Sequence, residues 1–136
     1  MKTIFKKSVI AVIVLSLSVL SLSSCKKKEG ERGSDKFPLT NLTVAITSNV
    51  IYPSSNNVIV SYDIKNISGA DYTIQKYQLN PIKVRVVIGT TDGTSYQANL
   101  FISDVQAGKT VAMEQAVGYG AGKTVDLTKT KVELIY

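Results

Sequence analysis

The chain has 136 residues, with 16 Lys and Arg against 10 Asp and Glu, and a formal net charge of +6. Most of this excess lies before Phe37, because from Phe37 onward the chain has 8 basic and 7 acidic residues. A nearly neutral domain has no electrostatic footprint for nucleic acid, so nucleic acid is not expected as a partner. One cysteine and no histidine exclude an internal disulfide, a histidine-based catalytic triad and a His/Cys zinc site.

The first 24 residues have the features of a secretion signal. Met1 to Lys7 is basic, and Val9 to Leu22 is apolar except for three serines. The apolar run is shorter than the roughly 20 residues that a permanent membrane span needs. We therefore predict that residues 1–24 are a removable signal peptide.

The apolar run ends in Leu22-Ser23-Ser24-Cys25. This sequence resembles the lipobox of bacterial lipoproteins, in which a leucine is followed by two small residues and a cysteine. The resemblance implies cleavage between Ser24 and Cys25, a diacylglycerol on the sulfur of Cys25, and a fatty acid such as palmitate on the new amino group. Membrane lipid would then be a partner through Cys25, and two or three acyl chains would hold the protein durably. An uncleaved anchor with an incidental cysteine is the alternative.

Residues 25–36 are expected to connect this anchor to a folded domain. Lys26 to Lys36 has two glycines and no apolar residue, so it is predicted to be a disordered tether. Its 11 residues span at most about 36 Å when extended. In enteric lipoproteins an Asp directly after the lipidated cysteine retains the protein in the inner membrane. Lys26 stands there instead, so the resemblance favours the outer membrane over the inner membrane.

Residues 37–136 are predicted to form one all-β domain. From Leu39 to Tyr136 the apolar residues recur with a period of two, which is typical of strands with one buried face. The alternation is found in residues 42–47, 58–65, 82–88, 95–100, 111–114 and 131–136. Turn residues separate these segments, and Asp92-Gly93 tolerates the positive φ angles of a tight hairpin. The pattern predicts a single antiparallel β-sandwich of about seven strands.

The order of these features resembles the immunoglobulin-like domains of exported bacterial proteins. The matching parts are a strand that ends at Lys65-Asn66, a strand pair around Asp92-Gly93, and the turn Ala107-Gly108-Lys109-Thr110 before a long strand. The domain has no tryptophan and no cysteine pair, so it departs from the antibody type. The resemblance implies a fold and no particular activity.

Two features of the sequence bear on cofactor chemistry. The stretch from Val117 to Thr124 ends like a phosphate-binding loop, but Val117 replaces its first glycine and a strand pattern follows it. A loop is expected there, and no nucleotide. Four aspartates are conceivable calcium ligands: Asp63, Asp71, Asp92 and Asp104. Their spacing does not resemble a calcium loop, so no metal or other cofactor is predicted.

The tyrosines are the remaining candidates for a contact surface. Tyr62 and Tyr96 fall on apolar faces and are expected in the core. Tyr72, Tyr77 and Tyr119 lie in or beside loops, where rigid aromatic side chains make good contact surfaces. These three are predicted to form a contact patch, and ordinary packing at the loop bases is the alternative.

The favoured hypothesis is a lipid-anchored, non-enzymatic module of the cell envelope. Its partner would be another envelope or extracellular protein, reached through loops or a free sheet edge. A surface adhesin for host or matrix macromolecules is the first alternative. A small-ligand binding protein or enzyme accessory domain is the second alternative, and it needs a pocket lined by converging polar groups.

Overall fold

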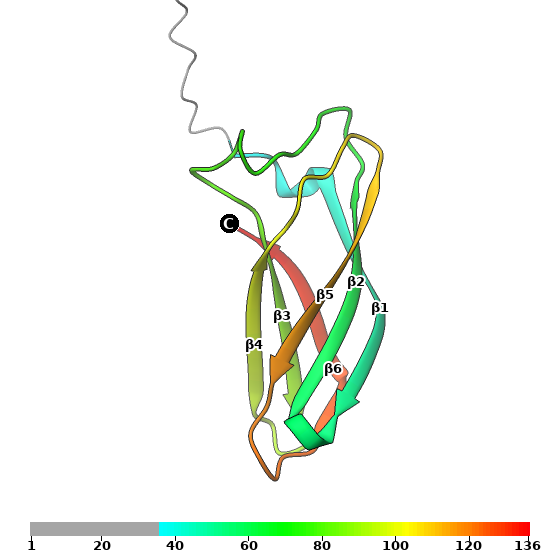
Figure 1. The fold of residues 1–136 in the computed structure, drawn as a ribbon, viewed down its shortest axis with the longest axis vertical. Helices are drawn as coiled ribbons and strands as arrows, with labels where there is room; N and C mark the ends of the chain where they lie inside the picture. Colours follow the sequence, from blue (N-terminus) through cyan, green and yellow to red (C-terminus); the bar gives the residue numbers. More distant parts are fainter. Residues whose placement is uncertain (1–35) are drawn as a thin grey trace, which may run out of the picture. The chain divides into compact units, whose positions relative to one another are not determined.

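A computed structural model describes residues 36–136. The predicted signal peptide, the cleavage position at Ser24 and Cys25, and the tether up to residue 35 lie outside the described residues. The described part is an all-β sandwich of two antiparallel, three-stranded sheets (Figure 1). The predicted fold class is confirmed, with six strands where about seven were expected.

Each sheet contains strands that are not consecutive in the chain. The first sheet has the order β1 (Leu42–Tyr52), β2 (Asn57–Asn66), β5 (Thr110–Gly118). The second sheet has the order β4 (Ser95–Phe101), β3 (Lys83–Thr90), β6 (Val125–Ile135). Short 3-10 helices, Leu39–Asn41 and Pro53–Ser55, precede and follow β1. The first, second and fifth strands of immunoglobulin-like sandwiches share a sheet in the same way.

The long connection between β2 and β3 contains no regular strand. Residues 67–82 form turns and bends, and a single isolated bridge joins Tyr72 to Val105. The six alternating segments of the sequence each overlap one of the six strands, and no further strand forms in this connection.

The central strands of the two sheets form the middle of the core. Every second residue of each strand is fully buried: Val58, Val60, Tyr62 and Ile64 on β2, and Val84, Val86 and Ile88 on β3. Burying each such side chain stabilises the fold by about 1.5–3 kcal/mol. Tyr62 is therefore in the core, as expected, and Tyr96 packs partly buried against it.

The edge strand β1 changes phase at Thr47. Its pairing with β2 shifts between Ile46 and Ser48, which leaves Thr47 as a bulge. Because cross-strand partners share a face, Ile46 lies on the inner face opposite Tyr62, whereas Val50 lies on the outer face opposite Ile59. The bulge explains why the alternation in the sequence ended at Thr47, and it turns two large side chains, Val50 and Tyr52, toward solvent.

A second bulge lies in β6. Val87 pairs with Lys131 and Gly89 pairs with Asp126, so one residue of β3 faces four residues of β6 in this interval. The aliphatic part of Lys129 lies directly over Gly89, where an added Cβ would come within 2.7 Å of the Cβ of Lys129. Lys129 also donates a hydrogen bond from Nζ to the carbonyl oxygen of Thr90 at 3.1 Å. Gly89 is thus required by close approach of the bulge.

Replacing Gly89 by Ala is expected to lower the free energy of unfolding by about 1–3 kcal/mol, because the added methyl group overpacks the contact with Lys129. Gly69→Ala is the matched control, since no atom lies within 4 Å of a Cβ built there. Denaturant unfolding of both variants measures the difference. Equal stability of the Gly89→Ala variant and the wild type would contradict the tight contact.

Candidate functional site

The strand ends nearest the described N-terminus form one region of the domain. Leu42 at the start of β1 pairs with Asn66 at the end of β2, and Lys83 at the start of β3 pairs with Ile135 at the end of β6. Three segments cover these ends: residues 36–41, 67–82 and 102–109. We call this region the loop end (Figure 1, top). The opposite end carries the shorter connections around residues 53–56, 91–94 and 119–124.

An aromatic cluster closes the loop end. The ring of Phe37 meets Tyr72 and Tyr77 edge to face, with centroids 5.5 and 5.4 Å apart. Tyr72 and Tyr77 stack on each other at 5.7 Å. Tyr72 is fully buried, burial raises the pKa of its hydroxyl, and this oxygen accepts a hydrogen bond from the N–H of Ile82 at 3.0 Å. The cluster joins the chain before β1 to the connection between the sheets.

The predicted contact patch of three tyrosines is not formed. Tyr72 and Tyr77 are 0% and 8% exposed, so they are core residues. Tyr119 lies at the opposite end, half-buried, where its N–H donates to the carbonyl oxygen of Asn56 at 2.8 Å. The physical reason is that residues 67–82 fold back over Phe37 and bury their own rings. For Tyr72 and Tyr77 the alternative, ordinary packing at loop bases, is what the structure describes.

Asn66 holds the covering loops together. Its side chain is fully buried, and Nδ2 donates to the carbonyl oxygens of Ala70 at 2.7 Å and Val105 at 3.0 Å. Its Oδ1 accepts hydrogen bonds from the N–H of Ser68 at 3.0 Å and from the hydroxyl of Ser68 at 2.8 Å. All four hydrogen-bonding positions of the amide are used, which gives the loop end a defined conformation.

Two of the aspartates weighed as calcium ligands serve the same loops. Asp71 Oδ1 accepts the N–H of Ala107 at 2.7 Å, and Asp104 Oδ1 accepts the N–H of Ile74 at 2.8 Å. Each carboxylate thus ties one loop to the backbone of another. Within residues 36–136 no three acidic, cysteine or histidine side chains are grouped as a metal site would need.

Exposed apolar side chains surround the buried cluster. Five of the eight large apolar residues that are exposed among residues 36–136 belong to the loop end: Ile67, Ile74, Leu79, Phe101 and Tyr136. Leu79 is 70% exposed, the highest value among them. The loop end therefore exposes three aliphatic side chains from a loop and two aromatic side chains at strand ends. The predicted patch of three tyrosines included none of these five residues.

Lysines lie between these apolar side chains. The Nζ atoms of Lys36 and Lys83 lie 4.4 and 5.2 Å from the ring centroids of Tyr136 and Phe101, and that of Lys76 lies 5.2 Å from the ring of Tyr77. A cation over an aromatic face is attracted by the ring quadrupole. Lys36 is the last residue of the predicted tether, and the sequence does not distinguish Lys76 and Lys83 from other lysines, because only the fold brings them beside rings.

The other exposed large apolar residues all lie on β1: Ile46, Val50 and Tyr52. This strand forms the edge of its sheet and contains no charged residue or proline over its 11 residues. Natural edge strands are usually protected from pairing by charge or proline. By comparison, β6 is an edge strand with four charged residues. The uncharged edge of β1 is a second candidate contact surface.

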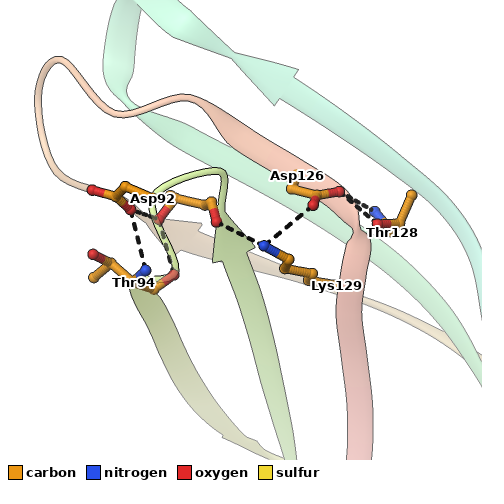
Figure 2. A network of polar contacts seen from close by, with 6 residues as sticks. Asp92, Thr94, Asp126, Thr128 and Lys129 are labelled. Carbon is orange, nitrogen blue, oxygen red and sulfur yellow. Dashed lines mark hydrogen bonds and ion pairs between the residues drawn. The ribbon is translucent and has the colours of Figure 1, made fainter.

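The opposite end contains a polar network that connects the turns (Figure 2). Asp92 accepts hydrogen bonds from the hydroxyl of Thr90 at 2.6 Å and the N–H of Thr94 at 3.1 Å, and it pairs with Lys123. Lys123 is the lysine of the stretch that ends like a phosphate loop. Its ammonium group neutralises a carboxylate, and a strand begins at Val125, so this stretch is a turn, as expected.

The network lowers the pKa of both of its carboxylates. The hydrogen bond from Lys123, followed by those from Thr90 and Thr94, holds the pKa of Asp92 far below its usual value. The hydroxyl of Thr128 has the largest effect on Asp126, whose pKa is also lowered. These contacts stabilise ionised side chains within turns, and we assign the network a structural role.

The Asp92→Asn variant is expected to lose less stability than the wild type as the pH is lowered. A carboxylate with a lowered folded-state pKa stabilises the fold at pH above its usual pKa of 3.8, and this contribution is lost as pH falls through the lower value. Between about pH 5 and pH 2 the wild type should therefore lose more stability than the variant. Thermal unfolding at stepped pH measures this. A variant that loses stability in acid as steeply as the wild type would contradict the contact between Asp92 and Lys123.

Comparison of the chain with protein-family models, with curated proteins and with solved structures finds no match. In the part of the chain that the structure describes, no helix is both long and apolar enough to cross a bilayer. The class that the described residues define is therefore an all-β sandwich with two exposed apolar surfaces, the loop end and the β1 edge.

Proposed function

We propose that the protein is a bacterial lipoprotein of the cell envelope whose sandwich domain binds another envelope protein without catalysing a reaction. The observation that carries the proposal is the order of features in the first 25 residues: a basic start, a short apolar run, and Leu22-Ser23-Ser24-Cys25. A diacylated or triacylated Cys25 would keep the domain at a membrane, with the outer membrane favoured over the inner membrane.

The edge of β1 supports the binding part of the proposal. An extended segment of a partner protein can add to a free sheet edge through main-chain hydrogen bonds, and its side chains then give specificity. The bulge at Thr47 divides this edge into two parts. The part from Ser48 to Tyr52 offers Val50 and Tyr52 on the outer face, where each favourable cross-strand pair would contribute about 0.2–1 kcal/mol.

Replacing Cys25 by Ala is expected to abolish the incorporation of a labelled fatty acid and to leave a precursor that retains its 24-residue leader. The reason is that the thiol is the atom that accepts the diacylglycerol, and cleavage follows that step in the lipoproteins which this sequence resembles. Mass spectrometry of the purified chain measures both. Ser23→Ala keeps a small residue before the cleavage position and should be processed normally. A mature wild-type chain with a bare thiol at position 25 would overturn the anchor.

A photo-crosslinking residue at Ser48 is expected to capture a second envelope protein in living cells. The control is the same residue at Gln97, which is exposed on the other uncharged edge strand, β4. Val50→Lys should lower the yield at Ser48 about tenfold, corresponding to about 1.4 kcal/mol, because a lysine would replace an apolar contact.

Equal yields at the two positions, or a yield at Ser48 that Val50→Lys leaves unchanged, would contradict binding at the β1 edge. Protease treatment of intact cells separates the adhesin alternative, since a host-facing adhesin is cleaved and a module facing the periplasm is spared.

A further inference from the structure

The most exposed apolar side chains of the described domain share one end. Leu79, Ile67 and Phe101 are 70%, 56% and 52% exposed, more than any other large apolar residue among residues 36–136, and all three belong to the loop end. Ile67 and Leu79 come from the connection between β2 and β3, whereas Phe101 ends β4. Exposed apolar side chains from separate segments thus lie at the same end of the domain.

This surface is held in place from beneath. The stacked rings of Tyr72 and Tyr77, and the fully hydrogen-bonded amide of Asn66, fix the loops that carry the exposed side chains. The exposed apolar side chains are therefore carried by loops whose backbone is fixed by buried residues.

The charge at the loop end is predominantly basic. Five lysines belong to it: Lys36, Lys65, Lys76, Lys83 and Lys109. Its two aspartates, Asp71 and Asp104, each use a carboxylate oxygen to bind backbone N–H groups. At the opposite end the charges are matched, because Asp92 pairs with Lys123 and Asp126 pairs with Lys129. The excess of positive charge therefore coincides with the apolar surface.

We propose that the loop end docks on an anionic phospholipid bilayer, with Leu79, Ile67 and Phe101 inserted at the headgroup boundary and the lysines on lipid phosphates. Apolar side chains that penetrate this boundary by about 5–10 Å, surrounded by basic residues, are the recognised basis of interfacial binding. Each lysine near an anionic surface adds to this attraction. A tyrosine ring such as that of Tyr136 is favoured at the same depth.

The position of the described N-terminus supports a bilayer as the occupant. This inference rests on the proposed lipid anchor at Cys25. Lys36 belongs to the loop end, and Cys25 precedes it by 11 residues, which no chain can stretch beyond about 36 Å. The strand β6 has 11 residues and extends about 36 Å, so the opposite end lies about one strand length farther from the anchor than the loop end does. The anchored chain would bring the apolar and basic end to the membrane.

Tryptophan fluorescence tests the contact, because the chain contains no tryptophan. The full lipidated protein carries Leu79→Trp as a single probe, and the matched control is Ala121→Trp, an exposed position at the opposite end. Both are reconstituted in vesicles of phosphatidylethanolamine and phosphatidylglycerol with or without brominated acyl chains. Emission from position 79 should shift to the blue and be quenched by bromine, and emission from position 121 should do neither. Ile67→Trp repeats the test at a second exposed site.

A second set of measurements tests whether docking needs anionic lipid. Quenching at position 79 should decrease in vesicles of phosphatidylcholine alone and at high salt, since salt screens exposed lysines. Equal quenching in all vesicles would overturn the role of anionic lipid. A blue shift without bromine quenching would mean that protein covers the surface, and it would overturn bilayer docking.

The two proposals fail in different ways. If Cys25 carries no lipid by mass, the lipoprotein function itself is wrong. If the lipid is present and the protein stays with the vesicles while positions 79 and 67 remain unquenched, only the docking of the loop end is wrong.

Discussion

Burial of Tyr72 and Tyr77 against Phe37 is the interaction on which the arrangement of the loop end depends. The connection between β2 and β3 is 16 residues long and has no strand hydrogen bonds of its own beyond one bridge. The rings anchor it to the chain segment that precedes β1. This packing holds in place the connection that carries Ile67, Ile74 and Leu79. The same rings explain how a large exposed apolar surface coexists with an ordered backbone.

A polar interaction completes this packing. The loops that cover the loop end leave backbone carbonyl groups in a buried setting, where an unsatisfied group costs about 1–3 kcal/mol. The side chain of Asn66 donates to the carbonyl oxygens of Ala70 and Val105, and the carbonyl of Val105 also accepts the N–H of Tyr72. Apolar burial and hydrogen bonding thus act on the same loops, and the exposed residues above them are a consequence of both.

The fold class was predictable from alternation, and the errors in strand length have local causes. The bulge at Thr47 inverts the phase of β1, and the extra residues opposite Ile88 break the period of β6 before Lys131. On β5 the partly buried Gln115 puts a polar residue among the inward-facing positions. In each case a strand continues although its period-two pattern is interrupted, so the predicted segments were too short.

The candidate surfaces were less predictable than the fold. Loops have no periodicity, so the sequence could not show that Tyr72 and Tyr77 face inward while Leu79, two residues after Tyr77, faces solvent. The exposed edge of β1 also depends on strand order, which the alternation does not reveal. The lipid anchor, in contrast, is predicted from the sequence alone, and Cys25 lies outside the described residues.

The closeness of the two ends of the described chain has a topological consequence. The hydroxyl of Tyr136 donates to the carbonyl oxygen of Phe37 at 2.9 Å, although 99 positions separate them. A short linker would close this gap and permit a circular permutant opened at the turn after Tyr52. Such a chain would keep the same strand neighbours, and its new N-terminus would lie at the end opposite the loop end. The end of the sandwich that is attached to the anchor could then be changed without changing the fold.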